Sequence, residues 1–417
     1  MKIDKENMYD IVQKIIKKSP FDTEINLLSK RDIEVEYERF PITSYVESAN
    51  LEIRITKGKR YGYSSTSDPK KWKKCLSDAS KIMRISKPLD IEPEISEKQR
   101  YVEKKPNKKL WSMTSEKFLS IFKDLSVEKT KIRTANIAKS IANGIVANSN
   151  GVFHYSDSVA LSAGIQVNYK GASSFGVKID DKPFDTQKVA EEAEKFCLMS
   201  LKPRKVKTMI TDAVFDYFAL SSLIEAILVP AFFADRMQAG SSFLCEKLGQ
   251  KLFSDKLNIV DDGTKGLFSV PCDNEGVSTK RKVLIDKGIP RTLLYDLYSS
   301  QKDGKTSTGN CSSISKRPSI GPTNIIIKPG KSNILDYESD HLIVRSLTGV
   351  HTSNPVSGDF SVTLDDAFYK RRAVKHAMIS GNIFQLLNNI DLIGKTSRQD
   401  GVIKTPPIKF KELQLIA

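Results

Sequence analysis

The sequence predicts an α+β protein with two domains, an N-terminal domain over residues 1–200 and a β-rich C-terminal domain over residues 208–417. The chain has 417 residues, which is more than one hydrophobic core usually serves. The expected strands and helices do not alternate regularly, and this favours α+β over a doubly wound parallel sheet. The stretch 201–207 is basic and interrupted by Pro203, as is typical of a linker.

The N-terminal domain is expected to combine helices with an antiparallel sheet. Alternating apolar residues predict strands, and apolar residues three and four positions apart predict helices. The expected strands lie around residues 33–37, 51–55, 61–63, 141–146 and 152–155. The expected helices lie around residues 8–16, 68–83, 118–125 and 185–196.

Three local features of this domain give sharper expectations. Asn150 and Gly151 predict a hairpin turn, because both residues tolerate positive φ. The helix at 68–83 is expected to bury Ile82 with the rest of its apolar face. The stretch 86–111 is rich in Pro, Glu and Lys and shows little periodicity, so we expect an exposed excursion there.

The C-terminal domain is expected to begin with a strand and a long apolar helix at about 214–229. Its clearest hairpin lies at 283–290, where Asp286, Lys287 and Gly288 supply the turn. The remaining expected elements are strands at 324–327, 342–344 and 360–364 and a helix at 381–390.

The basic charge limits the classes of partner. A net charge of +16, from 66 basic and 50 acidic residues, allows attraction to nucleic acid or to another acidic partner. The lysines occur in scattered pairs, without an arginine-rich run and without interleaved aromatic residues on which bases could stack. We therefore favour a solvated basic surface over nucleic-acid binding.

The sequence is expected to belong to a cytoplasmic protein with no membrane segment. Its five cysteines are scattered without a Cys-x-x-Cys pair, which indicates a reducing compartment. The N-terminal residues lack the apolar core of a signal peptide. The most apolar stretch, 214–234, contains Asp216 and Glu225, which a bilayer-spanning helix would not tolerate.

Few residues are spaced for metal or nucleotide binding. The four histidines are His154, His341, His351 and His376. No two of them lie three or four positions apart, the spacing that brings two imidazoles to one metal, so no metal site is expected. Gly171 and Gly176 have the spacing of a phosphate-binding loop, but Val177 follows where the lysine is needed.

One loop contains the residue types of a hydrolytic triad, His351, Ser353 and Asp359. A triad is defined by its geometry, which three near neighbours in one loop rarely reach. We therefore expect a binding or structural loop there, and we assign no catalytic residue.

Several segments, taken in order, resemble the TldD/PmbA family, which is named for a modulator of DNA gyrase. The Asn-Ser-Asn-Gly turn at 148–151 is similar to the central hairpin of that family. The other matching segments are Ile-Val-Asp-Asp-Gly-Thr at 259–264, Cys-Asp-Asn-Glu-Gly-Val at 272–277, Val-Leu-Ile-Asp-Lys-Gly-Ile at 283–289, Lys-Thr-Ser-Thr-Gly-Asn at 305–310, Pro-Val-Ser-Gly-Asp-Phe-Ser at 355–361 and Ile-Ser-Gly-Asn-Ile at 379–383.

The resemblance implies a dimeric cytosolic α+β protein with a proteolytic chamber between its subunits. The TldD-type member of the family binds zinc through a His-Glu-x-x-x-His helix and a cysteine near the C-terminus. In this sequence, Glu225 and Pro230 fall near the two histidine positions, and Asp400 stands in place of the cysteine. The resemblance is therefore to the PmbA/TldE type, with no metal ligands and no cofactor in this chain.

The expected function is that of a PmbA/TldE-like subunit without the zinc motif. Its expected partner is a TldD-like subunit that carries the zinc, in a heterodimer, with a homodimer as the alternative. An extended peptide is the expected substrate, bound as an added strand. The residues expected to contact it lie in one loop and are His351, Asn354, Ser357, Gly358 and Asp359.

Two alternative functions remain open at the level of sequence. The chain is a self-sufficient hydrolase if Ser353 or Cys311 acts as a nucleophile without metal. It is a basic protein that binds nucleic acid or associates with gyrase if the net positive charge serves that purpose.

Overall fold

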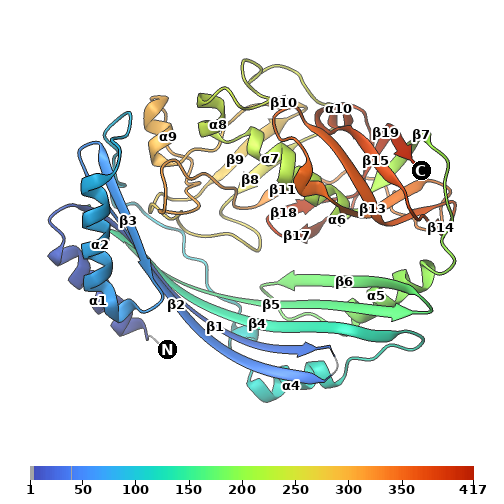
Figure 1. Cartoon of the computed structure of the whole chain (residues 1–417), viewed down its shortest axis with the longest axis horizontal. Coiled ribbons are helices and arrows are strands. Elements are labelled where there is room, and N and C mark those ends of the chain that lie inside the picture. The colour runs from blue at the N-terminus through green and yellow to red at the C-terminus, as the bar shows by residue number, and fades with distance from the viewer. Residues whose placement is uncertain (1–3, 39) are drawn as a thin grey trace.

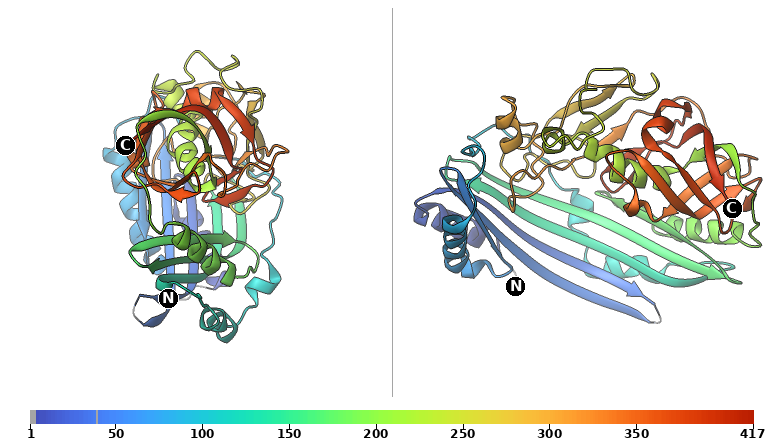
Figure 2. Two further views of the ribbon diagram at one scale, coloured as in Figure 1. Left: turned by 90° about the vertical axis from the view of Figure 1, so that its right-hand side faces the viewer. Right: turned by 45° about the horizontal axis from the view of Figure 1, so that its top comes forward.

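The computed structural model describes residues 4–38 and 40–417, and it confirms the α+β class. A long curved sheet from the first half of the chain runs along the molecule, and the second half lies over one side of it (Figure 1; Figure 2). Among the helices of the described residues, none has the length and apolar character that crossing a membrane requires.

The first sheet has six antiparallel strands in the order β3-β2-β1-β4-β5-β6. These strands are β1 (Asp22–Tyr37), β2 (Pro41–Lys57), β3 (Arg60–Thr66), β4 (Lys131–Asn148), β5 (Phe153–Tyr169) and β6 (Ala172–Asp180). The hairpin turn predicted at Asn150 and Gly151 is confirmed. It joins β4 to β5, with the Asn148 side chain accepting from the Asn150 and Val152 amides and with Gly151 at a φ of 87°.

Alternation along the strands gives this sheet two different faces. On β1, Ile25 and Leu27 are buried beneath helices, whereas the side chain of Asn26 faces the second half and donates to the carbonyl of Asn274 at 3.2 Å. Ile82 was expected to be buried, but it lies on the solvent side of its helix and is 44% exposed. The helices that pack on the same face as Ile25 and Leu27 are α1 (Lys5–Lys18), α2 (Trp72–Ile85, after the 3-10 turn η1, Pro69–Lys71), α3 (Lys108–Trp111), α4 (Ser115–Lys123) and α5 (Gln187–Met199).

The stretch 86–111, which we call the strap, is mostly exposed and irregular, as the sequence predicted, but it is anchored at points that the sequence did not indicate. Ile95 and Ser96 are buried within it. Tyr101 donates its hydroxyl hydrogen to the carbonyl of Gly276 at 2.8 Å, which fastens the strap to the second half. These partners lie far away in the sequence, so local periodicity contains no sign of them.

The second half contains a mixed six-stranded sheet and a barrel. The sheet has the order β10-β9-β8-β11-β18-β17, and the barrel strands have the order β12-β7-β19-β15-β13, with β12 also pairing to β13. This closure pairs the edges that an open sheet would expose. The strands are β7 (Met209–Phe215), β8 (Ile259–Asp262), β9 (Arg281–Asp286), β10 (Ile289–Pro290), β11 (Ile325–Ile327), β12 (Leu342–Thr348), β13 (Asp359–Tyr369), β14 (Arg372–Ala373), β15 (Met378–Asn382), β16 (Ile390–Ile393), β17 (Arg398–Asp400), β18 (Ile403–Thr405) and β19 (Ile408–Ile416).

The helix predicted at 214–229 begins later than expected and changes geometry along its length. Residues up to Phe215 belong to β7, and Asp216 caps the helix that follows. Pro230 has no amide hydrogen for the carbonyl one turn before it, and a wider π turn precedes it. The segments are α6 (Tyr217–Leu223), the π turn η2 (Ile224–Leu228) and α7 (Val229–Ala231).

The other elements of the second half are close to expectation. The hairpin predicted at 283–290 is confirmed by β9 and β10. The helix predicted at 381–390 is shorter, because Gly381 pairs with Phe360 between β15 and β13. The remaining short helices are α8 (Ala234–Gln238), α9 (Leu297–Lys302), α10 (Ile383–Asn388) and the 3-10 turn η3 (Val350–Thr352).

A buried cluster of charges joins the first sheet to the second half. Arg54 on β2 contacts Glu24 on β1 at 2.5 Å and Glu275 of the second half at 2.6 Å. Arg317 of the second half contacts Glu24 at 2.6 Å. All four side chains are at most 2% exposed. Because each charge is out of water, each depends on the others for compensation.

The Arg54→Met variant should lower the free energy of unfolding by about 3–5 kcal/mol, because it leaves Glu24 and Glu275 buried with one counter-charge fewer. Urea denaturation followed by circular dichroism measures this. Arg84→Met removes an exposed arginine from α2 and should change the value by less than about 0.5 kcal/mol. Equal effects of the two substitutions would contradict the role of the cluster.

Candidate functional site

The structure brings together two of the three positions at which the family resemblance places zinc ligands. Glu225 lies in η2 and Asp400 ends β17. A Cβ atom placed on Gly401 would be 3.6 Å from Glu225 Oε2, so the carboxylate of Glu225 lies beside the end of β17. Partial burial, and next the charge of Asp400, raise the pKa of Glu225. Pro230 follows in α7.

The helix that carries these residues is fixed at its start by a buried acid. The side chain of Asp216 accepts from the Tyr217 amide at 2.6 Å, and it also accepts from the Tyr337 hydroxyl. Burial raises the pKa of Asp216 to about 6, against the lowering effect of its hydrogen bonds and of Arg345. One turn into the helix, Ser221 donates its hydroxyl hydrogen to Asp400, which ties α6 to β17.

Arginines connect this site to the first half of the chain. Arg398 of β17 contacts Glu192 of α5 at 2.8 Å, and Arg345 of β12 contacts the same carboxylate at 3.4 Å. Arg345 also pairs with Asp366 at 2.7 Å, and both guanidinium groups lie over the ring of Phe218. The site therefore lies where the barrel meets α5.

The residues at this site do not fit a zinc ion. A catalytic zinc needs three protein ligands and an open position. Here two carboxylates come together, and one of them, Asp400, already accepts a hydrogen bond from Ser221. The side chain of Pro230 has no atom that could bind a metal. Across residues 4–38 and 40–417, no three His, Cys, Asp or Glu side chains are arranged to hold a metal.

The loop expected to bind peptide is a compact turn between η3 and β13. Asn354 Oδ1 accepts from the amides of Val356 and Ser357, and the Gly358 amide donates to the Asn354 carbonyl at 2.9 Å. Gly358 has a φ of 87°, and a Cβ there would lie 2.4 Å from the Phe384 ring, so only glycine fits. These bonds hold the loop in one shape.

His351, Ser353 and Asp359 of this loop do not form the hydrogen-bonded chain of a catalytic triad. The Asp359 carboxylate accepts from Asn382 Nδ2 at 2.8 Å, and His351 is exposed in η3. The hydroxyl of Ser353 is buried without a partner among the described residues. The other nucleophile considered, Cys311, is buried, and burial holds its pKa well above the ordinary value of a thiol. A thiol without its thiolate form is a poor nucleophile.

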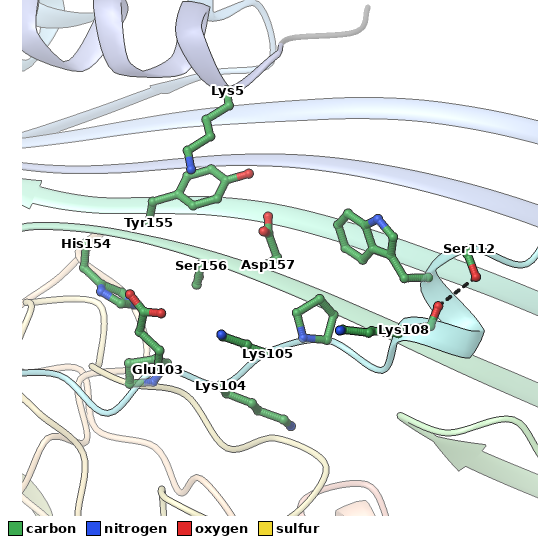
Figure 3. A pocket seen from close by; sticks show the side chains of 13 residues that line it. Lys5, Glu103, Lys104, Lys105, Lys108, Ser112, His154, Tyr155, Ser156 and Asp157 are labelled. Atoms are coloured by element: carbon green, nitrogen blue, oxygen red, sulfur yellow. Dashed lines mark hydrogen bonds between the residues drawn. The ribbon is translucent and has the colours of Figure 1, made fainter.

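The structure also contains a cavity that the sequence did not indicate. It has a volume of about 640 Å³ and lies between β5 and the strap, with His154 and Tyr155 on the strand and Lys105 and Lys108 on the strap (Figure 3). The sequence showed these lysines only as scattered basic pairs, and His154 only as one of four unpaired histidines. Their common location depends on where the strap crosses the sheet.

Known proteins resemble this chain both in sequence and in fold. A family model described as the PmbA/TldA metallopeptidase C-terminal domain matches residues 208–417. An uncharacterized protein of Methanocaldococcus jannaschii is 28% identical over 415 residues, which are 95% of this chain and 97% of that protein. The metalloprotease PmbA homolog of Buchnera aphidicola is 29% identical over 269 residues, which are 63% of this chain and 58% of that protein. TldE from Thermococcus kodakarensis shares the fold, with a TM-score of 0.86, 24% identity and coverage of 98% of this chain and 100% of that chain.

The raised pKa of Asp216 should appear in the pH dependence of stability. The pKa of this carboxyl group is about 6 in the folded protein, against an ordinary value of 3.8. Ionisation of the group therefore disfavours the folded state. This group therefore reduces the free energy of unfolding by up to about 3 kcal/mol as the pH rises from about 4 to about 7. Asp216→Asn keeps an oxygen for the helix cap and should remove this component.

The measurement is the difference in unfolding free energy between wild type and variant at several pH values. Asp255→Asn removes an exposed carboxylate and should leave the pH dependence as it is in the wild type. If the difference between wild type and Asp216→Asn stays constant from pH 4 to pH 7, the buried carboxyl does not titrate in this range.

Proposed function

Because the chain belongs to the PmbA/TldD family, we propose that it serves as a PmbA/TldE-type subunit that lacks a zinc site and pairs with a TldD-like zinc metallopeptidase. Its relatives include proteins named as metalloproteases. The proposed setting is the cytoplasm, and the proposed process is the cleavage of peptides or proteins. Pairing with a second copy of the same chain is the alternative assembly.

One observation supports the non-catalytic role above the others. The family-equivalent positions Glu225 and Asp400 lie close together as a pair of acids, with Asp400 accepting a hydrogen bond from Ser221, instead of a set of nitrogen and sulfur ligands. A catalytic zinc site needs a third ligand, and Pro230 cannot supply it. Hydrolysis of peptides by zinc therefore requires ligands from another subunit.

The proposed contribution of this subunit is to complete the chamber and to hold an extended peptide. The loop with His351, Asn354, Ser357, Gly358 and Asp359 is the proposed contact surface. Its internal bonds hold it in one shape, so it would lose little entropy on binding. Main-chain pairing to an extended peptide gives affinity with little dependence on sequence.

The other candidate functions have less support. A nucleophilic mechanism would need an activated Cys311 or Ser353, and burial works against both. Binding to nucleic acid would need aromatic and basic side chains arranged along one surface. The cavity between β5 and the strap does combine lysines with Trp111 and Tyr155, but the strand beside it suits a peptide backbone better than phosphates.

The proposal predicts that zinc and peptidase activity appear only in a complex. Purified alone, the chain should bind no stoichiometric zinc and cleave no peptide. Mixed with a TldD-like protein that carries the His-Glu-x-x-x-His helix, it should form a complex with one zinc per partner subunit and with peptidase activity that a chelator abolishes. Elemental analysis and cleavage of an unstructured fluorogenic peptide measure both properties.

The matched control for this experiment is a partner in which the first histidine of the motif is replaced. It should still assemble with the chain but lose zinc and activity. If the lone chain binds one zinc and shows chelator-sensitive proteolysis, the proposal is wrong.

The loop proposal predicts a defect in substrate binding without a loss of stability. In the active complex, His351→Ala should raise the KM for an extended peptide about threefold to tenfold, because an exposed contact is removed from the peptide surface. His341→Ala changes another exposed histidine, outside the loop, and should leave KM unchanged. Identical kinetics for both variants would exclude His351 as a peptide contact.

A further inference from the structure

Part of the first sheet has a free edge. β5 pairs with β4 from Phe153 onwards, but its pairing with β6 begins only at Leu161. Within the described chain, no strand pairs with the other edge of residues 153–160. Alternate amide and carbonyl groups along this edge are therefore available to another chain.

The strap runs beside this edge without pairing to it. Tyr101 packs against His154, with ring centroids 4.8 Å apart, and Lys104 is held by Asp181 at 3.1 Å. At the other end of the strap, Lys139 donates to the Trp111 carbonyl at 3.1 Å. These contacts fix the strap at a distance from β5, and they hold open the groove of about 640 Å³ seen in Figure 3.

The groove contains polar groups that lack partners within the described residues. His154 is 8% exposed, and its Nε2 atom has no hydrogen-bond partner. Burial lowers the pKa of His154, which favours the neutral form of the ring in the wall of the groove. Lys105 and Lys108 are exposed on the strap and have no carboxylate partner among residues 4–38 and 40–417.

The remaining charges of the groove do not cancel these lysines. Asp157 is engaged by Asn143 Nδ2 at 2.5 Å, and Glu103 stands on the strap near His154. Lys5 adds a further cation and lies over the Tyr155 ring at 4.2 Å. The cations of the groove thus outnumber its carboxylates, which favours an acidic ligand.

We propose that this groove binds an acidic peptide segment in extended conformation, as an additional strand on the free edge of β5. The edge of eight residues is about 26 Å long, which suits a peptide of similar length. Lys105 and Lys108 would pair with its carboxylates, and Trp111 and Tyr155 would cover apolar side chains.

A nucleic acid fits this edge less well. A strand edge presents carbonyl acceptors as well as amide donors, and a peptide backbone supplies partners for both. Phosphate oxygens only accept, so they would leave the carbonyl groups unpaired and next to negative charge. The inference concerns this chain alone and does not depend on the proposed zinc-bearing partner.

The test uses the full chain and a fluorescein-labelled, end-capped eight-residue peptide in which glutamate alternates with valine or threonine. Fluorescence anisotropy should show saturable binding at low salt. A peptide of the same sequence with every backbone nitrogen methylated should bind at least about tenfold more weakly, because neither of its edges retains amide hydrogens that can pair with β5. A peptide with lysine in place of glutamate should bind at least about tenfold more weakly as well.

The variants locate the site. Lys105→Glu combined with Lys108→Glu should weaken binding of the acidic peptide about tenfold or more. Lys109→Glu reverses the charge of the neighbouring exposed lysine, which does not line the groove, and should weaken binding less than about threefold. Circular dichroism of all variants establishes that they are folded.

Three results would overturn the proposal. They are equal affinity of the methylated and unmethylated peptides, equal effects of the groove and control variants, and binding of a single-stranded oligonucleotide with no binding of the acidic peptide. The lone chain needs no peptidase activity for any of these measurements. Failure here would therefore leave the proposed subunit role standing, and failure of that role would leave this site standing.

Discussion

The arrangement of the whole molecule depends on the buried ion cluster of Arg54, Arg317, Glu24 and Glu275. The first sheet contributes Arg54 and Glu24, and the second half contributes Arg317 and Glu275. Each arginine contacts the glutamate of its own half, and it also contacts the glutamate of the other half at 2.6 Å, so the two halves share one network of buried charges. Separating the halves would leave charges in an apolar environment, or would require their hydration at the cost of the packing around them. The cluster also affects the neighbouring Asp273. Burial, and next the charge of Glu275, raise the pKa of Asp273 to about 8.

Both candidate sites depend on this junction because each is assembled from the two halves. At the barrel end, Glu192 of the first half holds Arg398, the first residue of the strand that ends in Asp400. At the other end, the strap reaches the second half through Tyr101 and returns to the sheet at Lys139. Moving one half relative to the other would change the position of β17 against α5 and the width of the groove beside β5.

The sequence was sufficient for elements whose cause is local and insufficient for those whose cause is distant. The hairpin at Asn150 and Gly151 follows from backbone preference alone, and the alternation on β1 follows from one face being buried. The exposure of most of the strap was predicted, but its anchor points were not, because Ser96 and Tyr101 bond to the second half. The helix at 214–229 was misplaced because an apolar strand passes directly into an apolar helix, and only the cap at Asp216 separates them.

The candidate sites divide in the same way. The resemblance identified Glu225 and Asp400 as equivalent positions, but their proximity and the bond from Ser221 are properties of the folded chain. The groove at His154 could not be predicted, since it depends on the register at which β6 stops pairing with β5. A free edge is normally a hazard for aggregation, and a loop that covers such an edge usually lies against it. Here the strap is fastened at both ends and still stands off from β5, so it blocks association between flat sheets while leaving room for a single extended chain.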